Sequence, residues 1–262
     1  MQLDHPVALV IGAILHDRRK AAQVTAEVAA RRLRIPSDQL HQIEAGQGYI
    51  SSTDVQRLCG MYGACNEAAA LTNLGRVAWY PSMRRPQLGD DPFAAPRYDR
   101  ATGSTERLST VMRQSERVRW LAPSDIPPPL RTPDLAAATA LPGFTPVAFP
   151  APRPQDVFIL DEQTLKGTGR GDAMTGQIRH LLDLRRGGAQ IHLLPLPPHT
   201  DQVIELTLPA GTVIARHHFH PDYQATDTLA ADIDKALAGP VSGPDPLEQA
   251  LAQHTAGERT AR

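Results

Sequence analysis

The stretch from Val24 to Gly46 constrains the fold most, because apolar residues recur in it at helical spacing on both sides of a short break. The run Ile35-Pro36-Ser37 interrupts the first apolar stripe, and a second stripe through Leu40 and Ile43 follows it. Proline presets φ for a first helical turn, and glycine supplies the positive φ at which helices commonly end. The pattern therefore predicts a helix, a tight turn and a second helix.

The sequence beyond this stretch indicates a second region with a different fold class. At 262 residues the chain exceeds one small core, which favours two domains. We expect an all-α N-terminal helix-turn-helix bundle over 1–77 and a linker rich in Pro, Arg, Asp and Gly over 78–103. An α/β (α+β) domain with a mixed sheet follows over 104–255, and a disordered tail over 256–262.

Periodicity places the individual elements of this plan. Helical spacing predicts further helices over 7–22, 53–62, 66–77, 104–121, 172–186, 224–238 and 245–253. Short β-rich runs predict strands over 157–160, 191–194, 203–208 and 212–219, the last two joined by a Gly-containing hairpin turn. The Pro- and Phe-rich stretch 141–155 predicts a loop.

Composition limits which cellular compartment and which binding partners we expect. The net charge of −1 removes overall basicity as an argument for nucleic acid, so any such argument rests on local charge. Cys59 and Cys65 form neither a disulfide framework nor a zinc motif, and no apolar stretch reaches the ~20 residues of a membrane span. We expect a soluble cytoplasmic protein without a signal peptide, metal site or cofactor.

Basic and polar residues around the two helices are the candidates for DNA contact. A cluster of arginines flanks the first helix, where phosphate contacts and an ordinary solvated helix face are both consistent with the pattern. The second helix presents polar side chains that could approach base edges. The predicted DNA-binding set is Arg18, Thr25, Arg31, Arg32, Arg34, Ser37, Asp38, Gln39, His41 and Gln42.

The run from Thr25 to Gly46 resembles the helix-turn-helix of Xre-type (Cro/CI-like) regulators. The matching residues are Thr25, Ala30, Ile35, Leu40, Ile43, Glu44 and Gly46. Three positions depart from the family pattern: Ala26 replaces a contact glutamine, Arg34 a turn glycine and Gln42 a frequent arginine. The resemblance implies the fold of the module, and the departures fall where that family contacts DNA.

Further motifs resemble, in order, the C-terminal domain of actinobacterial Xre-type regulators of the WhiJ-like group. They are residues 106–120, 126–132, 161–165, 174–178 and 191–195, and they extend the resemblance over most of the chain. A helix that the group places before its Asp-Glu segment is missing here and replaced by the 141–155 loop. That group's C-terminal domain has a poorly defined function.

Several C-terminal clusters have both functional and structural interpretations. Gly167 to Gly171 fits neither phosphate-loop spacing nor the dinucleotide fingerprint, so a turn is favoured. Asp161-Glu162 fits a helix start better than a catalytic pair. A ligand pocket between the sheet and the Pro/Phe loop would have Trp120, Phe144, Phe149, Phe158, His192, His218 and His220 as its lining.

Two functions of different classes follow. The first is a DNA-binding transcriptional regulator whose C-terminal domain binds a small molecule or a partner protein, as a monomer or homodimer. The second is the same scaffold repurposed as a small-molecule-binding protein or biosynthetic enzyme with weak or no DNA binding, because fold alone does not determine function. A gene position inside a natural-product cluster, without a palindromic upstream site, would favour the second.

Overall fold

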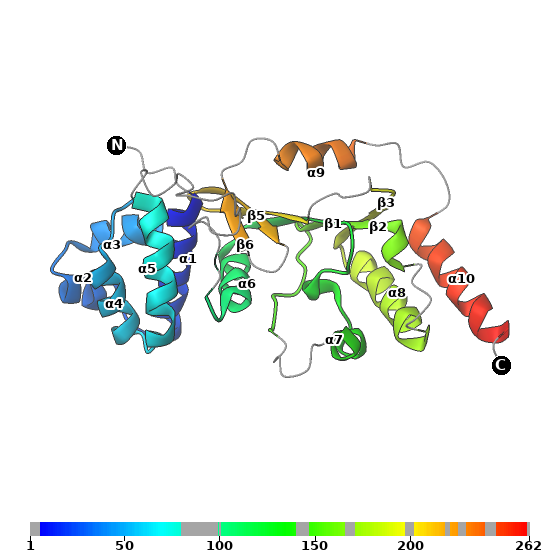
Figure 1. Cartoon of the computed structure of the whole chain (residues 1–262), viewed down its shortest axis with the longest axis horizontal. Helices are drawn as coiled ribbons and strands as arrows, with labels where there is room; N and C mark the ends of the chain where they lie inside the picture. The colour runs from blue at the N-terminus through cyan, green and yellow to red at the C-terminus, as the bar shows by residue number, and fades with distance from the viewer. Residues whose placement is uncertain are drawn as a thin grey trace, which may run out of the picture. The chain divides into compact units, whose positions relative to one another are not determined.

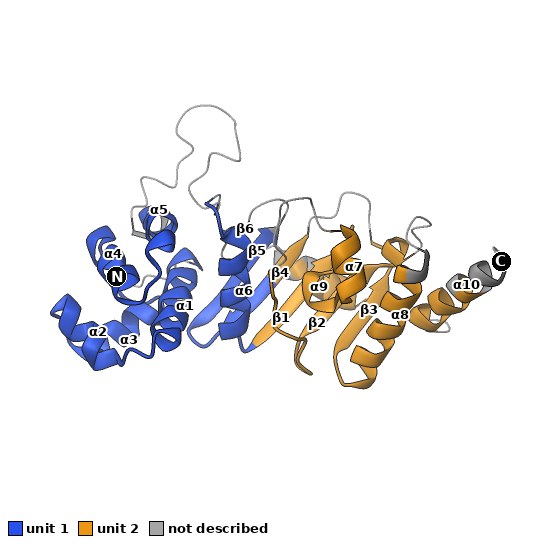
Figure 2. Cartoon of the chain, turned by 90° about the horizontal axis from the view of Figure 1, so that it is seen from below, with its two compact units in different colours: residues 1–116, 205–226 blue, residues 117–204, 227–262 orange. Residues whose placement is uncertain are grey.

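A computed structural model describes most of the chain as two compact units (Figure 2). The described residues are 6–79, 99, 101–139, 147–165, 171–196, 202–217, 221–224, 229–238 and 245–260. Unit 1 combines residues 1–116 with 205–226, and unit 2 combines 117–204 with 227–262. Each unit is therefore built from two separate stretches of sequence. The predicted domain limits stay a prediction.

Unit 1 begins with a small helical bundle around one apolar core. Its elements are α1 (Pro6–Ala21), α2 (Ala26–Leu33), α3 (Ser37–Glu44), α4 (Ser52–Met61), the 3-10 helix η1 (Cys65–Glu67) and α5 (Ala68–Trp79) (Figure 1). Val7, Ile11 and Leu15 of α1 are buried at successive helical turns, as the spacing predicts. Leu40 of α3 and Leu58 of α4 are also fully buried in the bundle.

The rest of unit 1 comes from both stretches of the chain. It comprises α6 (Ser104–Gln114), β4 (Val203–Leu208) from residue 205 onward, β5 (Gly211–His217) and β6 (Pro221–Gln224), with the strands in the order β4-β5-β6. β5 and β6 pair antiparallel. Helix α1 packs against α6, β5 and β6 as well as against the bundle, so one helix serves both parts of the unit.

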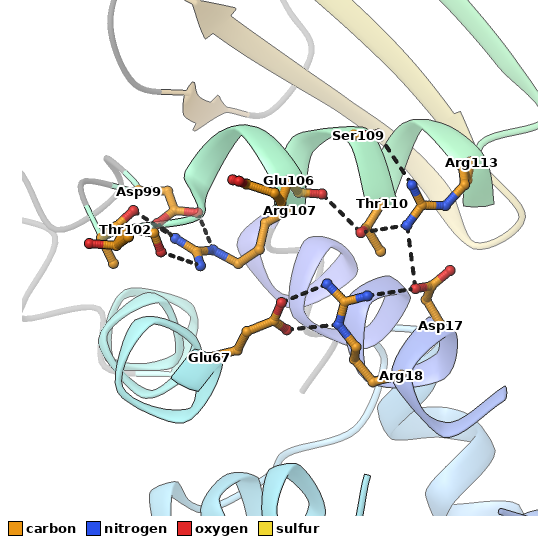
Figure 3. A network of polar contacts seen from close by, with 11 residues as sticks. Asp17, Arg18, Glu67, Asp99, Thr102, Glu106, Arg107, Ser109, Thr110 and Arg113 are labelled. Carbon is orange, nitrogen blue, oxygen red and sulfur yellow. Dashed lines mark hydrogen bonds and ion pairs between the residues drawn. The ribbon is translucent and has the colours of Figure 1, made fainter. Parts of the chain in front are cut away.

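A network of buried and half-buried charges, with the exposed Arg113 at its edge, joins α1, η1 and α6 (Figure 3). Arg18 donates to both carboxylate oxygens of Glu67, at 2.6 and 3.0 Å, and to Asp17. Asp17 also accepts from Gln114 at 3.1 Å and lies 3.5 Å from the Arg113 guanidinium. Arg107, only 1% exposed, binds both carboxylate oxygens of Asp99. Because buried charges need partners, these contacts hold the elements in one arrangement.

Unit 2 is built on three parallel strands. They are β1 (Arg117–Ala122), β2 (Val157–Asp161) and β3 (Gln190–Leu194), in the order β3-β2-β1. Its helices are η4 (Pro128–Leu130), α7 (Pro133–Thr139), η5 (Glu162–Leu165), α8 (Gly171–Arg186), α9 (Leu229–Leu237) and α10 (Pro246–Thr260). Helices α7 and α8 lie on one side of these strands and α9 on the other, while α10 packs on α8 (Figure 1).

Two polar side chains fasten the loops of unit 2. Gln177 of α8, fully buried, donates to the carbonyl of Leu130 and accepts from the amide of Thr132, both at 2.7 Å. Asp156 accepts from the amide of Val118 at 2.8 Å. Satisfying these buried backbone groups fixes the connections around the parallel strands.

The predicted fold class is confirmed: an all-α bundle is followed by helices and strands with both parallel and antiparallel pairing. Three predicted elements are wrong in detail. The helix expected over 104–121 ends at Gln114 and β1 follows, β6 replaces the start of the helix expected at 224, and α10 continues to Thr260 where a disordered tail was expected. Among the described residues, no helix is long and apolar enough to cross a membrane.

Candidate nucleic-acid interface

Helix α2 begins at a side-chain cap and buries one face. The Thr25 hydroxyl accepts a hydrogen bond from the amide of Val28 at 3.3 Å, which satisfies one of the unpaired amides of the first turn. Ala29, Ala30 and Leu33 are buried against the bundle, and Arg31 and Arg32 are exposed. The helix therefore places two adjacent guanidinium groups in solvent.

Arg34 forms the turn between α2 and α3 in the left-handed conformation. Its φ is 60° and its ψ 42°, and its amide donates to the carbonyl of Arg31 at 3.2 Å. A left-handed residue other than glycine costs about 1–2 kcal/mol. The turn thus keeps the backbone that a glycine would favour and adds an exposed cationic side chain to it.

Helix α3 separates its residues into an inner and an outer face. Leu40, Ile43 and Glu44 are buried. The outer face carries polar side chains that are all exposed, namely Asp38, Gln39, His41 and Gln42. Its length and outward polar face suit an element that reads a DNA groove.

A buried ion pair anchors the inner face of α3 to α1. Arg19 donates to both carboxylate oxygens of Glu44 at 2.7 Å, and His16 Nδ1 lies 3.0 Å from Glu44 Oε2. Burial alone would raise the pKa of Glu44, but the hydrogen bonds from Arg19 and His16 outweigh it and lower that pKa to about 2. Glu44 is therefore a carboxylate that holds the fold rather than a group that faces DNA.

The lowered pKa of Glu44 predicts an acid-sensitive unit 1. Because the pKa is about 2 in the folded chain against an ordinary value of 4.5, the carboxylate contributes stability that is fully present above pH 4.5. That contribution is lost as the pH falls from 4.5 towards 2. We expect the difference in unfolding free energy between the wild type and Glu44→Gln to shrink over this window, measured by urea denaturation. A difference independent of pH would contradict it.

Two glycines let α1 and the end of α3 approach closely. A Cβ added at Gly12 would lie 2.4 Å from the carbonyl oxygen of Glu44, and one added at Gly46 would lie 2.6 Å from the backbone of Leu9. Gly46 also has a φ of +71°. The Ile-Glu-x-Gly end of α3 thus consists of residues required for packing.

The structure places most of the predicted DNA-binding residues on one motif, with one exception. Thr25, Arg31, Arg32 and Arg34 belong to α2 and its ends, and Ser37 to Gln42 belong to α3. Arg18 lies in α1, where its guanidinium binds Glu67 and Asp17 (Figure 3). Ala26, at the family's contact position, is only 8% exposed.

Replacing Arg34 with glycine should separate the effect of Arg34 on stability from its effect on DNA binding. We expect Arg34→Gly to stabilise the fold by about 0.5–1 kcal/mol, because relief of the left-handed strain exceeds the added entropy of the unfolded chain. If Arg34 contacts phosphate, the same change should reduce the salt dependence of DNA binding by about one unit.

The matched control is Gln23→Gly, because Gln23 is also left-handed, with a φ of 55°, and precedes α2. It should stabilise the protein without changing DNA affinity. Equal effects of both variants on DNA affinity would contradict a phosphate contact by Arg34.

The predicted C-terminal pocket residues that the structure describes lie together only in part. Trp120 and Phe158 are each 1% exposed and stack with ring centroids 6.5 Å apart, and the Phe149 ring meets Trp120 edge-on at 6.4 Å. His192 is half-buried in β3, and burial lowers its pKa. Phe144, His218 and His220 lie outside the described residues, as does 167–170 of the Gly-rich run. A ligand pocket there stays a prediction.

The role of Arg19 was missed because its charge grouped it with the solvated arginines. Its spacing carries a signal, since Arg19 follows Ile11 and Leu15 at intervals of four on the buried stripe of α1. A charged residue on such a stripe needs a buried partner, and Glu44 is the partner.

Residues 10–71 match the family model of a helix-turn-helix domain. The match covers α2, the turn and α3 together with most of the surrounding bundle. Comparison with curated proteins and with solved structures finds no match for the chain. The N-terminal part of the chain therefore contains a helix-turn-helix domain.

Proposed function

We propose that the protein is a transcriptional regulator that binds DNA through α2 and α3. The observation that carries this proposal is the exposed surface of the motif: α2 and its turn carry exposed arginines, and α3, which packs against α2, has a polar outer face. Arginines position a protein on phosphates, and side chains of a recognition helix read base edges. The match of residues 10–71 to a helix-turn-helix domain supports the same function.

The proposed contacts divide by chemistry. Gln39, His41 and Gln42 approach base edges, because their amide and imidazole groups can both donate and accept hydrogen bonds. Arg31, Arg32 and Arg34 contact phosphates. Thr25, Ser37 and Asp38 lie at the starts of the two helices, where they complete the interface. Arg18 is left out because Glu67 and Asp17 already bind its guanidinium.

We propose that unit 2 receives a signal, either a small molecule or a partner protein. Its three parallel strands alternate with helices, an architecture that commonly binds ligands at the carboxyl ends of its strands. The subfamily proposed is the Xre type with a WhiJ-like C-terminal domain, acting in the cytoplasm. A homodimer on a two-fold symmetric site would fit this class of regulator.

Removing two of the proposed phosphate contacts should weaken DNA binding and its salt dependence. We expect Arg31→Ala with Arg32→Ala to lower affinity about 10-fold or more at low salt, and to flatten the salt slope by about one to two units. The measurement is fluorescence anisotropy on DNA from upstream of the gene, across a salt series.

The matched control removes two exposed arginines of α8, Arg179→Ala with Arg186→Ala, which changes the net charge equally. It should leave the slope intact. An unchanged slope in the α2 variant, or no wild-type binding even at ~50 mM salt where phosphate contacts are strongest, would refute the proposed function.

A further inference from the structure

A pocket of about 270 Å³ lies within unit 1, beside the C-terminal half of α3. Its walls come from α1, α3, the end of α6 and the turn between β4 and β5, all of which belong to that one unit. Leu9, Ala45 and Pro209 give it apolar walls, and His16, His41 and Gln114 give it polar ones. Its size is near the lower end for small-molecule sites, which suits a small ligand.

The polar groups have defined hydrogen-bond roles. One N–H of the Gln114 amide donates to Asp17 at 3.1 Å, which leaves the carbonyl oxygen as an acceptor and the second N–H as a donor. His16 Nδ1 lies 3.0 Å from Glu44 Oε2 and 3.4 Å from Arg19 Nη2, and the shorter contact, to a carboxylate that only accepts, favours the proton on Nδ1. In the neutral ring, Nε2 is then also an acceptor. The Gln114 carbonyl oxygen and His16 Nε2 can each accept a hydrogen bond from a ligand.

The charge at this end of the pocket is already balanced. Glu44 is bound by Arg19 on both carboxylate oxygens, and Asp17 is bound by Arg18. A cationic ligand would therefore find no unpaired carboxylate among these residues. A neutral donor group is the better match to two acceptors beside apolar walls.

We propose that this pocket binds a small, largely apolar molecule that carries a hydroxyl or N–H donor at one end, as phenols and indoles do. His41 lies both on the pocket wall and on the exposed side of α3, so a bound molecule contacts the helix that carries the proposed base-reading residues. Occupancy therefore changes DNA affinity. This effect on DNA rests on the proposed function, whereas occupancy of the pocket does not.

Phenol and toluene form a matched pair of probes, because they differ by the donor group alone at similar size. We expect phenol, titrated into the ¹⁵N-labelled full chain, to shift amide signals of His16, Ala45 and Ala210. Toluene should shift the same signals with about 2- to 10-fold weaker affinity, the worth of one neutral hydrogen bond. Equal affinities, or shifts confined to other residues, would overturn the proposal.

Two variants test the site without altering the outer face of α3. Ala210→Phe fills the pocket from the turn and should weaken phenol binding at least 10-fold, whereas Ala69→Phe, on an exposed face of α5, should not. Gln114→Met keeps the volume but removes one of the two acceptors, so the preference for phenol over toluene should shrink. Unchanged phenol binding and preference in folded Ala210→Phe and Gln114→Met would overturn the proposal.

DNA binding separates the two proposals. In fluorescence anisotropy, saturating phenol should change the DNA affinity of the wild type at least 3-fold and that of Ala210→Phe not at all. If DNA binds and phenol occupies the pocket without any such change, the coupling is wrong. If phenol occupies the pocket but no DNA binds, the proposed function fails and the site stands.

Discussion

Replacing Glu44 with alanine should destabilise unit 1 by about 3–5 kcal/mol, the cost of leaving a buried charge without its partner. The side chain of Arg19 is 5% exposed and that of Glu44 4%, so the guanidinium could not recover its lost contacts from water. We expect hydrogen exchange of peptides from α1 and α3 to accelerate sharply. A midpoint of urea unfolding close to that of the wild type would contradict this result.

Two companion variants isolate the cause. Glu27→Ala removes an exposed carboxylate of α2 and should change stability far less than Glu44→Ala does. Arg19→Met combined with Glu44→Leu removes both charges and should recover most of the loss, because two apolar side chains replace the buried ion pair and neither charge is left without its partner. Failure of the double variant to recover would mean that the geometry of the pair itself specifies the fold.

Gly12→Ala should also be strongly destabilising, by about 3 kcal/mol or more, although alanine ordinarily favours a helix. The added Cβ would lie 2.4 Å from the Glu44 carbonyl oxygen and 2.7 Å from that of Ile43, and both are backbone atoms. Helices α1 and α3 would have to move apart. Urea denaturation of the variant measures the loss.

Gly60→Ala is the matched control, because a Cβ at Gly60 in α4 meets nothing within 4 Å. There the same substitution should stabilise the protein by about 0.5–1 kcal/mol through helix propensity. Stability changes of opposite sign at Gly12 and Gly60 would show that the close helix contact, and not helix propensity, causes the loss in Gly12→Ala. A stabilising Gly12→Ala would show that the helices can separate without cost.

The helices of the bundle could be predicted from sequence because local patterns determine them. Leu40 and Ile43 lie on one predicted stripe, and both are buried on the inner face of α3. The left-handed turn at Arg34 could be anticipated only by analogy with a glycine at that place. Nothing in an arginine itself indicates a positive φ.

The errors in the strands have physical reasons. Val118 continued the helical spacing of α6, but Val118 and Trp120 also alternate with Arg117 and Arg119, a period of two that the structure adopts as β1. β6 has four residues and begins with a proline, as an edge strand can, and it is too short to show a period.

Some features of the candidate site could be predicted from local sequence and others could not. Exposure of Arg31, Arg32 and the outer residues of α3 follows from periodicity alone. The pairing of Arg18 with Glu67 and of Arg19 with Glu44 depends on residues 49 and 25 positions away, which no local pattern connects. The pocket beside α3 depends on a turn that is still farther along the chain.

Because unit 1 is assembled from both 1–116 and 205–226, its completion has an order in time. During translation, α1 leaves the ribosome long before β5 and β6, the strands against which it packs. The side of α1 that these strands cover stays uncovered until they are synthesised. The nascent chain therefore carries an unfinished unit 1 while all three parallel strands of unit 2 are already made.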